Sequence, residues 1–205
     1  MPKTVVTDVL VVGGGLAGLC ASVAARARRA RVVLVTKHGV GRPSSTFFSV
    51  GAFRVAADEY RVEDFVRETL EAGRYVNNPK LVEVLAREST AAICRLEELG
   101  LRFRIRGGTA YVQTGSKVAK GAEIVEKLTD AAETLGIGEI PHAVPLDIVF
   151  HDGYWVVPTW CWREDRILTI FSKALVIATG GVAGIYERTT NPPGNVGDGH
   201  ALAMR

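Results

Sequence analysis

The hydrophobic pattern of the chain opens on a run that is apolar without alternation. Residues 5–12 are mainly β-branched and apolar, with Asp8 as their only charge. Such a run is typical of a strand that is covered on both faces of a parallel sheet. Glycines 13–15 end it, an alanine-rich helical stretch follows over 16–29, and residues 31–35 form a second apolar run. The pattern therefore predicts β-turn-α-β, the opening of a doubly wound α/β fold.

The middle of the chain predicts a long loop and then helices. Residues 36–57 have no helical period and are rich in Gly, Ser, Pro and Phe, as in functional loops. Helical spacing predicts helices over 62–73, over 78–100 and over 121–135. The second of these has Asn78 as N-cap, Pro79 as first helical residue and Gly100 as stop. Its packing side is expected to hold Leu81, Leu85, Ile93 and Leu96.

Short strands dominate from residue 144 onward. Alternating and aromatic runs over 144–150, 154–162 and 166–171 predict an antiparallel meander. Its expected hairpin turns are Asp152-Gly153 and Glu164-Asp165. Pro158 lies inside the middle run, which predicts an edge strand or a bulge at that residue.

A last buried strand of the parallel type is predicted over 174–178, directly before Thr179-Gly180-Gly181. The predicted fold class is α/β, a doubly wound Rossmann-like domain with a small antiparallel β-meander. We expect a single domain over 1–205, with the meander at 144–171 inside it.

Composition narrows the class of protein. The 205 residues are 47% hydrophobic and 23% charged, which is ordinary for a globular protein. The net charge of only +3 argues against a nucleic-acid partner. Three dispersed cysteines match no metal spacing, and Cys20 and Cys94 are expected as buried thiols in helices. No stretch is long and apolar enough to predict a membrane span, and no signal peptide is visible. A reducing, cytoplasmic location is expected, with attachment to a membrane only through a partner.

The pattern Gly13-x-Gly15-x-x-Gly18 follows a predicted strand and opens a predicted helix. In that context the first glycine permits a tight turn and the second admits a pyrophosphate. The third lets the helix pack closely on the strand. The pattern favours a dinucleotide, with a ligand-free glycine turn as the alternative.

The second strand lacks the acidic residue that usually follows it in dinucleotide-binding folds. Val35-Thr36-Lys37 stands there, which argues against a plain NAD-dependent dehydrogenase. Lys37 is interpreted either as a surface lysine or as a neighbour of a phosphate. Ala178-Thr179-Gly180-Gly181, after the last buried strand, fits either a close approach to a cofactor or a simple tight turn.

Five segments of the chain carry a combined pattern. They are DVLVVGGGLAGL, VTKHGVGRPSSTFFSVGAF, EDFVRETLEAGRYVNNPKLVEVL, ALVIATGG and TTNPPGNVGDGHALA. In order and spacing, these segments resemble the flavoprotein subunits of fumarate reductase and succinate dehydrogenase, and L-aspartate oxidase.

The resemblance implies FAD as the cofactor. It places the pyrophosphate at the glycine turn, Val144 near the adenine and Asp198 near the cofactor. Thr36 and Lys37 then match the Ser/Thr-Lys pair that the family has in place of the acidic residue. The cofactor-binding residues that we expect are Gly13, Gly14, Gly15, Leu16, Ala17, Gly18, Thr36, Lys37, Ser44, Ser45, Thr46, Phe47, Ser49, Gly51, Ala52, Val144, Ala178, Thr179, Gly180 and Asp198.

Two positions depart from the family pattern. Members with covalent flavin have a histidine directly before the loop threonine, whereas this chain has Ser45 before Thr46. Serine cannot form the histidyl bond, so non-covalent FAD is expected. Val50-Gly51-Ala52 replaces the family's Gln-Gly-Gly, which leaves the contacts to the flavin ring open.

The resemblance further implies hydride transfer between flavin N5 and a small dicarboxylate, either succinate/fumarate or L-aspartate. The family's catalytic His and Arg residues follow the TGDG region, so we expect the capping domain and C-terminal FAD segment to be absent here. No catalytic residue is therefore assigned. The alternatives are an FAD-binding or nucleotide-binding fragment without catalysis, a nicotinamide-binding domain, and a module completed by a second chain. Exposed apolar surface predicts a partner subunit or self-association.

Arg102, Arg104 and Arg106 alternate as on one face of a strand. They fit either a solvated strand face, which is the favoured interpretation, or a grip on a dicarboxylate.

Overall fold

The computed structural model describes residues 3–113 and 120–205. The chain folds as two compact units, Met1–Phe48 with Val125–Arg205, and Ser49–Ile124. The single domain expected over 1–205 stays a prediction.

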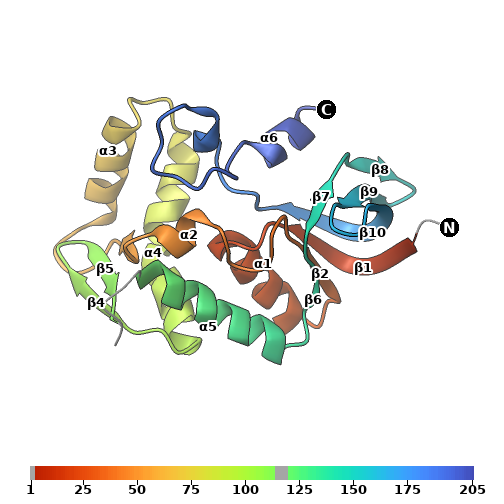
Figure 1. The fold of residues 1–205 in the computed structure, drawn as a ribbon. Coiled ribbons are helices and arrows are strands. Elements are labelled where there is room, and N and C mark those ends of the chain that lie inside the picture. The colour runs from red at the N-terminus through yellow and green to blue at the C-terminus, as the bar shows by residue number, and fades with distance from the viewer. Residues whose placement is uncertain (1–2, 114–119) are drawn as a thin grey trace. The chain divides into compact units, whose positions relative to one another are not determined.

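A mixed sheet forms the centre of the first unit (Figure 1). Within the described residues its strand order is β6-β2-β1-β10-β9-β7, and β8 also pairs with β9. The pairs β6·β2, β2·β1 and β1·β10 are parallel, and the remaining pairs are antiparallel. The strands are β1 (Lys3–Val12), β2 (Val32–Val35), β6 (Gly138–Ile140), β7 (Ala143–Pro145), β8 (Val149–His151), β9 (Tyr154–Cys161) and β10 (Arg166–Ile177).

The parallel strands are apolar because the sheet is covered on both faces. Leu10, Val12 and Val35 lie in one buried cluster with Val157 and Ile170 of the antiparallel strands. Helix α1 (Leu16–Ala27) follows β1 and buries Gly18, Leu19 and Ser22. The predicted β-turn-α-β opening and the α/β fold class with an antiparallel meander are confirmed.

The last strand is longer than the sequence predicts. Separate strands were expected over 166–171 and 174–178, whereas β10 runs without a break over Arg166–Ile177. Its first part pairs antiparallel with β9, and the strand from Leu168 onward pairs parallel with β1. Ser172 is buried and Lys173 forms an ion pair with Asp8 of β1, so these polar residues stay in the ladder instead of turning the chain. The meander and the parallel sheet are therefore one continuous sheet.

The predicted strand over 144–150 is also wrong, because it divides into β7 and β8. Both pair with β9, and the chain between them leaves the ladder opposite Pro158. The carbonyl oxygen of Pro158 accepts from the backbone N–H of Leu146 at 2.8 Å. The nitrogen of Pro158, which has no hydrogen to donate, faces the same side, where the two short strands separate. The irregularity expected at Pro158 thus lies in the neighbouring strand, which is interrupted between β7 and β8.

The hairpin turns form where the sequence predicts them. Asp152 and Gly153 both have positive φ, +49° and +79°, and join β8 to β9. Asp165, with φ +44°, lies in the connection from β9 to β10. Positive φ at two central residues is the geometry that joins twisted antiparallel strands.

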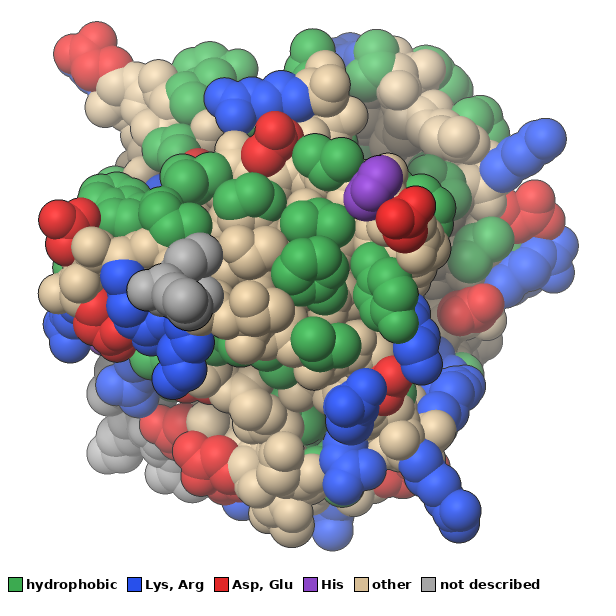
Figure 2. Space-filling view, turned by 90° about the vertical axis from the view of Figure 1, so that its right-hand side faces the viewer, with side chains coloured by type: hydrophobic (Ala, Val, Ile, Leu, Met, Phe, Trp, Pro, Cys, Tyr) green, Lys and Arg blue, Asp and Glu red, His purple; other side chains and the backbone are tan. Residues whose placement is uncertain are grey.

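Apolar side chains remain exposed on the antiparallel part of this unit. They belong to Leu146, Val149, Phe150, Trp160 and Ile167. Figure 2 views the side of Figure 1 on which β8 and β9 lie, and shows hydrophobic side chains interspersed with charged ones. Self-association through such surface stays a prediction.

The predicted loop over 36–57 contains short regular elements that its sequence did not indicate. They are helix α2 (Ser45–Phe48) and strand β3 (Ala52–Arg54). Each is four residues or fewer, too short to show a hydrophobic period. The chain ends in the 3₁₀ turn η1 (Ala183–Ile185) and helix α6 (Asp198–Ala203).

The second unit has a small antiparallel sheet and two helices. The strand order is β3-β5-β4, with β4 at Phe103–Arg106 and β5 at Thr109–Val112. Helices α3 (Val62–Ala72) and α4 (Pro79–Glu98) belong to this unit, and α5 (Lys120–Thr134) begins in it. Val55, Ile93 and Ala110 form its buried cluster.

Helix α4 confirms its predicted start and corrects part of its predicted packing side. The Asn78 side chain accepts from the backbone N–H groups of Lys80 and Leu81, as an N-cap does. Leu81 and Leu85, however, are 67% and 56% exposed. The apolar residues of α4 cover more of the helix surface than the neighbouring elements bury. The leucines of its first turns therefore stay exposed to solvent.

The cysteines also differ from expectation. Cys94 is exposed on α4 and Cys20 is half-buried, whereas both were expected to be buried. Only Cys161 of β9 is a buried thiol among the described residues, and burial raises its pKa. Arg104 and Arg106 alternate with half-buried neighbours on β4 and are exposed, as in a solvated strand face. No helix of the described residues is long and apolar enough to cross a membrane.

Candidate functional site: a dinucleotide pocket in the first unit

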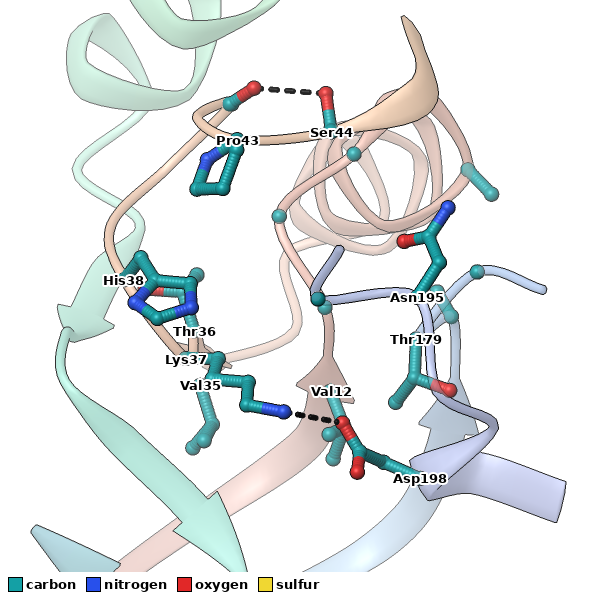
Figure 3. A pocket seen from close by; sticks show the side chains of 18 of the residues that line it. Val12, Val35, Thr36, Lys37, His38, Pro43, Ser44, Thr179, Asn195 and Asp198 are labelled. Carbon is teal, nitrogen blue, oxygen red and sulfur yellow. Dashed lines mark hydrogen bonds and ion pairs between the residues drawn. The ribbon is translucent and has the colours of Figure 1, made fainter. Parts of the chain in front are cut away.

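A pocket in the first unit lies where β1, β2 and β10 end (Figure 3). Because these strands are parallel, their carboxyl ends meet at one edge of the sheet, which is where doubly wound folds bind ligands. The turn after β1, the loop after β2 and the segment after β10 supply the lining. Residues 143–145 and Asp198 complete it.

Gly13 is held by the strands on both sides of β1. Its N–H donates to the carbonyl oxygen of Val35 at 2.9 Å, and its φ is +112°. A methyl group added at Gly13 would overlap the backbone of Ala178, at the end of β10. The tight turn therefore needs glycine both for its dihedral angle and for its space.

Gly18 sits in the first turn of α1, where an added methyl group would overlap the carbonyl oxygen of Gly13. This glycine lets the helix lie directly against the turn, as the sequence pattern predicts.

Gly15 differs, because packing does not require it. An added methyl group there would meet nothing closer than Ser44 Cβ, at 3.8 Å. Gly15 lines the pocket and N-caps α1, whose first turn has no acidic residue. The helix N-terminus thus presents its partial positive charge and close backbone to the pocket, an arrangement that suits a pyrophosphate.

The end of β2 is polar and tied to neighbouring elements. The Thr36 hydroxyl donates to Glu139 Oε1 of β6 at 2.7 Å. Lys37 Nζ forms an ion pair with Asp198 Oδ2 at 3.1 Å, drawn as a dashed line in Figure 3. Asp198 is the first residue of α6, where a carboxylate suits the helix dipole. The ion pair brings together two residues that are 161 positions apart in sequence.

The loop before α2 is fixed by its own serine and threonine. Ser44 Oγ donates to the carbonyl oxygen of Gly41 and accepts from the N–H of Phe47, at 2.7 and 3.1 Å. Thr46 Oγ1 accepts from the N–H of Leu16 at 3.3 Å. The loop is thereby joined to the start of α1.

Ser45 is engaged by the segment that follows β10. Its hydroxyl accepts from Asn195 Nδ2 at 2.6 Å and donates to Asn191 Oδ1 at 3.2 Å. Thr179 Oγ1 accepts from the N–H of Gly199 at 3.0 Å, and Gly180 has φ +81°. The contacts of Ser45 join the loop after β2 to the segment after β10. These two stretches line opposite sides of the pocket (Figure 3).

Most of the residues predicted from sequence line this one pocket. They are Gly13, Gly14, Gly15, Leu16, Ala17, Thr36, Lys37, Ser44, Ser45, Thr46, Val144, Ala178, Thr179, Gly180 and Asp198. Gly18 supports the turn from behind, and Phe47 lies under Arg42, whose guanidinium is 4.5 Å from the ring centre. Ser49, Gly51 and Ala52 belong to the second unit, and their role stays a prediction.

Sequence reasoning missed several lining residues. His38, Arg42, Pro43 and Asn195 line the pocket. Arg42 forms an ion pair with Glu126 at 3.2 Å. Asn195 lies within the TTNPPGNVGDGHALA segment quoted above, so that segment was the available signal for it. Arg42 lies in the loop segment VTKHGVGRPSSTFFSVGAF, whose sequence has no period that would indicate which of its side chains face a pocket.

The glycine turn, the open helix N-terminus and the parallel strand ends form a cradle that fits a dinucleotide. The family described as "FAD binding domain" matches residues 8–205. The chain belongs to this family. The resemblance predicted from sequence is therefore confirmed, and the cofactor of this FAD binding domain is FAD.

Similar proteins agree with this assignment. The chain is 29% identical over 210 residues to an L-aspartate oxidase from Clostridium perfringens, covering 98% of this chain and 47% of that protein. An L-aspartate oxidase from Mycobacterium tuberculosis is 31% identical, with 96% of this chain and 40% of that protein covered. This FAD binding domain thus spans less than half the length of these relatives.

Solved structures show the same fold. The open conformation of a flavocytochrome c3 fumarate reductase superposes with a TM-score of 0.84 at 28% identity, covering 99% of this chain and 40% of that one. Sdh1 of Mycobacterium smegmatis, in complex with UQ1, gives 0.80 at 27% identity, covering 99% and 38%. The domain is that of a flavoenzyme similar to fumarate reductase, succinate dehydrogenase and L-aspartate oxidase.

Proposed function

We propose that this chain is the FAD-binding part of an oxidoreductase that acts on a small dicarboxylate, either succinate/fumarate or L-aspartate. When bound, FAD supplies hydride transfer at its N5 atom. The names of the relatives support this substrate class. The observation that carries the cofactor half of the proposal is the pocket itself, where Gly15 is left small although the chain has room beside it.

Different residues of the pocket are proposed to contact different parts of FAD. The N–H groups at the start of α1 would receive the pyrophosphate, and Val144 would lie at the adenine. Lys37, paired with Asp198, would add positive charge near the phosphates. The role of each residue is part of the proposal.

The flavin is proposed to be held without a covalent bond. Ser45 stands where covalent members of the family have histidine, and both hydrogen-bonding roles of its hydroxyl are taken by Asn191 and Asn195. A serine hydroxyl held in this way positions the loop and offers no ring nitrogen to a flavin. We further propose that the location is cytoplasmic and that the protein associates with a partner subunit.

An absorption spectrum tests the cofactor. The purified chain, saturated with FAD and freed of excess, is expected to show flavin absorption, and acid precipitation is expected to leave all flavin in the supernatant. Flavin in the protein pellet would contradict the non-covalent assignment. A protein that ignores FAD and binds NADH would overturn the proposed cofactor site.

Gly15→Ala tests the pocket against packing. Because its added methyl group meets only ordinary van der Waals contacts, the apoprotein is expected to keep its melting temperature while FAD affinity falls about tenfold or more. Gly181→Ala is the matched control, since its added methyl group also overlaps no atom and Gly181 does not line the pocket. Equal FAD affinity in both variants would contradict the placement of the pyrophosphate.

Anaerobic bleaching of the flavin tests the substrate class. In the complete oxidoreductase, L-aspartate or succinate is expected to bleach the FAD absorption, and L-alanine, which lacks the second carboxylate, is the control. FAD absorption that no dicarboxylate bleaches would contradict the proposed substrate class.

A further inference from the structure

The end of β2 lacks a carboxylate in its own sequence but has one beside it in space. In dinucleotide-binding folds an acidic residue after the second strand accepts a hydrogen bond from a ribose hydroxyl. Here Thr36 occupies that place and lines the pocket. Its hydroxyl donates at 2.7 Å to Glu139, which belongs to the neighbouring parallel strand β6. A carboxylate therefore stands directly behind the residue that replaces the usual acid.

The sheet fixes this arrangement. Leu34 pairs with Glu139 in the parallel register of β2 and β6. The N–H of Thr36 donates to the carbonyl oxygen of Ile140 at 3.1 Å, and its own carbonyl oxygen accepts from Ala143 at 2.9 Å. Thr36 is only 2% exposed. Its backbone and its hydroxyl are thus both held by one segment, residues 139–143.

This contact decides what the Thr36 oxygen can bind. A threonine hydroxyl has one hydrogen, and Glu139 takes it. The oxygen then offers the pocket only lone pairs, and the charged partner strengthens it as an acceptor. A ribose hydroxyl, which can donate, satisfies it. A phosphate ester has only acceptor oxygens at this point and would approach the negative charge of Glu139.

The lysine next to Thr36 in sequence has a different partner. Lys37 Nζ forms an ion pair with Asp198 Oδ2 at 3.1 Å, whereas Glu139 Oε1 accepts from the Thr36 hydroxyl. The two carboxylates therefore have separate partners.

We propose that Glu139 is a positioning residue that acts through Thr36 and makes the site select an adenine nucleotide with a free ribose hydroxyl over its 2′-phosphorylated counterpart. The inference rests on the proposed function of the pocket as the FAD site. It deepens that function by naming how the ribose is distinguished, with a residue 103 positions from Thr36 and outside the motifs of the sequence.

Ligand discrimination tests the proposal. Affinities for FAD, ADP, 2′-deoxy-ADP, 3′-deoxy-ADP and adenosine 2′,5′-bisphosphate are measured by calorimetry on the wild type and on Glu139→Gln. The wild type is expected to prefer ADP over one of the deoxy forms by about tenfold, as a charge-supported hydrogen bond would give. In Glu139→Gln that preference should fall to about twofold, and the 2′-phosphorylated ligand should bind better than it does to the wild type.

Three further variants separate positioning from folding. Thr36→Val should abolish the ribose preference, because valine has no hydroxyl. Thr36→Ser should retain the preference, because serine keeps the hydroxyl. Glu133→Gln, which removes an exposed carboxylate of the same unit, should leave all affinities unchanged.

The outcomes are distinct. A ribose preference that is unchanged in Glu139→Gln, with FAD binding intact, would overturn the inference and leave the proposed function standing. Failure of the wild type to bind either FAD or ADP would overturn the proposed function, and the inference with it.

Discussion

The two units of the chain obtain their local geometry in different ways. In the first unit the site depends on backbone, since Gly13 and Gly18 leave no room for a methyl group beside main-chain atoms. In the second unit comparable ties are made by side chains at the surface. Arg54 contacts Glu68 at 2.6 Å and lies over the ring of Tyr60, whose hydroxyl also donates to Glu68. Backbone overlap cannot relax, whereas exposed side chains can move into water. The first unit should therefore tolerate far less change than the second.

The largest effect is expected from Gly18→Ala. The added methyl group would overlap the carbonyl oxygen of Gly13, so α1 must move away from the turn. We expect a loss of about 3 kcal/mol in the free energy of unfolding, as for an overpacked core, together with a loss of FAD binding. Urea unfolding and FAD titration measure the two effects. Gly181→Ala is the control, and a Gly18→Ala protein as stable as this control would refute the claim that backbone space governs the first unit.

A smaller effect is expected from Asp8, whose carboxylate joins three strands. It accepts from Arg31 beside β2 and forms an ion pair with Lys173 of β10, while Asp8 itself lies in β1. Hydrogen bonds from the Arg31 side chain and backbone, followed by that from Lys173, hold the pKa of Asp8 well below its usual range. A lowered pKa contributes stability that is present above about pH 4 and is lost as the pH falls further.

Asp8→Asn should therefore lower the thermal midpoint at pH 7 and flatten its decline between about pH 4 and pH 2. Glu68→Gln sharpens the comparison between the units. The pKa of Glu68 is lowered first by the Tyr60 hydroxyl and then by Arg54, so its effect has the same sign. Because Arg54 and Glu68 are exposed, the midpoint of Glu68→Gln should fall less than that of Asp8→Asn. The reverse order, measured by calorimetry across this pH range, would contradict the comparison, and Asp130→Asn controls for loss of a surface charge.

The smallest effect is expected from the exposed thiol of the second unit. Cys94 should react with a maleimide at least about tenfold faster than Cys161. Burial shields the Cys161 thiol from the reagent and raises its pKa. Cys94→Ser should leave both FAD affinity and unfolding unchanged. Mass spectrometry after timed labelling identifies the modified residue. Faster labelling of Cys161 would mean that the antiparallel part of the first unit opens more readily than the surface of α4.

Local chemistry made much of the fold and site predictable. The Gly13–Gly18 turn, the Asn78 cap and the Asp152-Gly153 hairpin each follow from the conformations that a few adjacent residues permit. These features need no knowledge of the rest of the chain. The pocket residues found from sequence are likewise those in contiguous motifs.

The errors arise where distant pairing decides. β10 continues without a break through Ser172 and Lys173, where Lys173 forms an ion pair with Asp8, far away in sequence. Leu81 has an apolar side chain at a helical position that no partner covers. Glu139 lies on β6, a three-residue strand without a visible pattern of its own, and only its parallel pairing with β2 brings it to Thr36. Such residues have no signature within their own segment.

The pairing of β1 with β10 also bears on how the chain assembles during synthesis. The register joins Lys3 to Leu168 and Val12 to Ile177, so the second neighbour of the first strand is made last among the strands of the described residues. Until the ribosome has released that segment, one edge of β1 stays open and Gly13 lacks the wall formed by Ala178. Sheets closed by such distant segments fold slowly, and their open edges invite association in the meantime. A nascent chain halted before residue 166 should thus bind chaperones that recognise exposed apolar strands. Chaperone binding should be lost when β10 emerges from the ribosome.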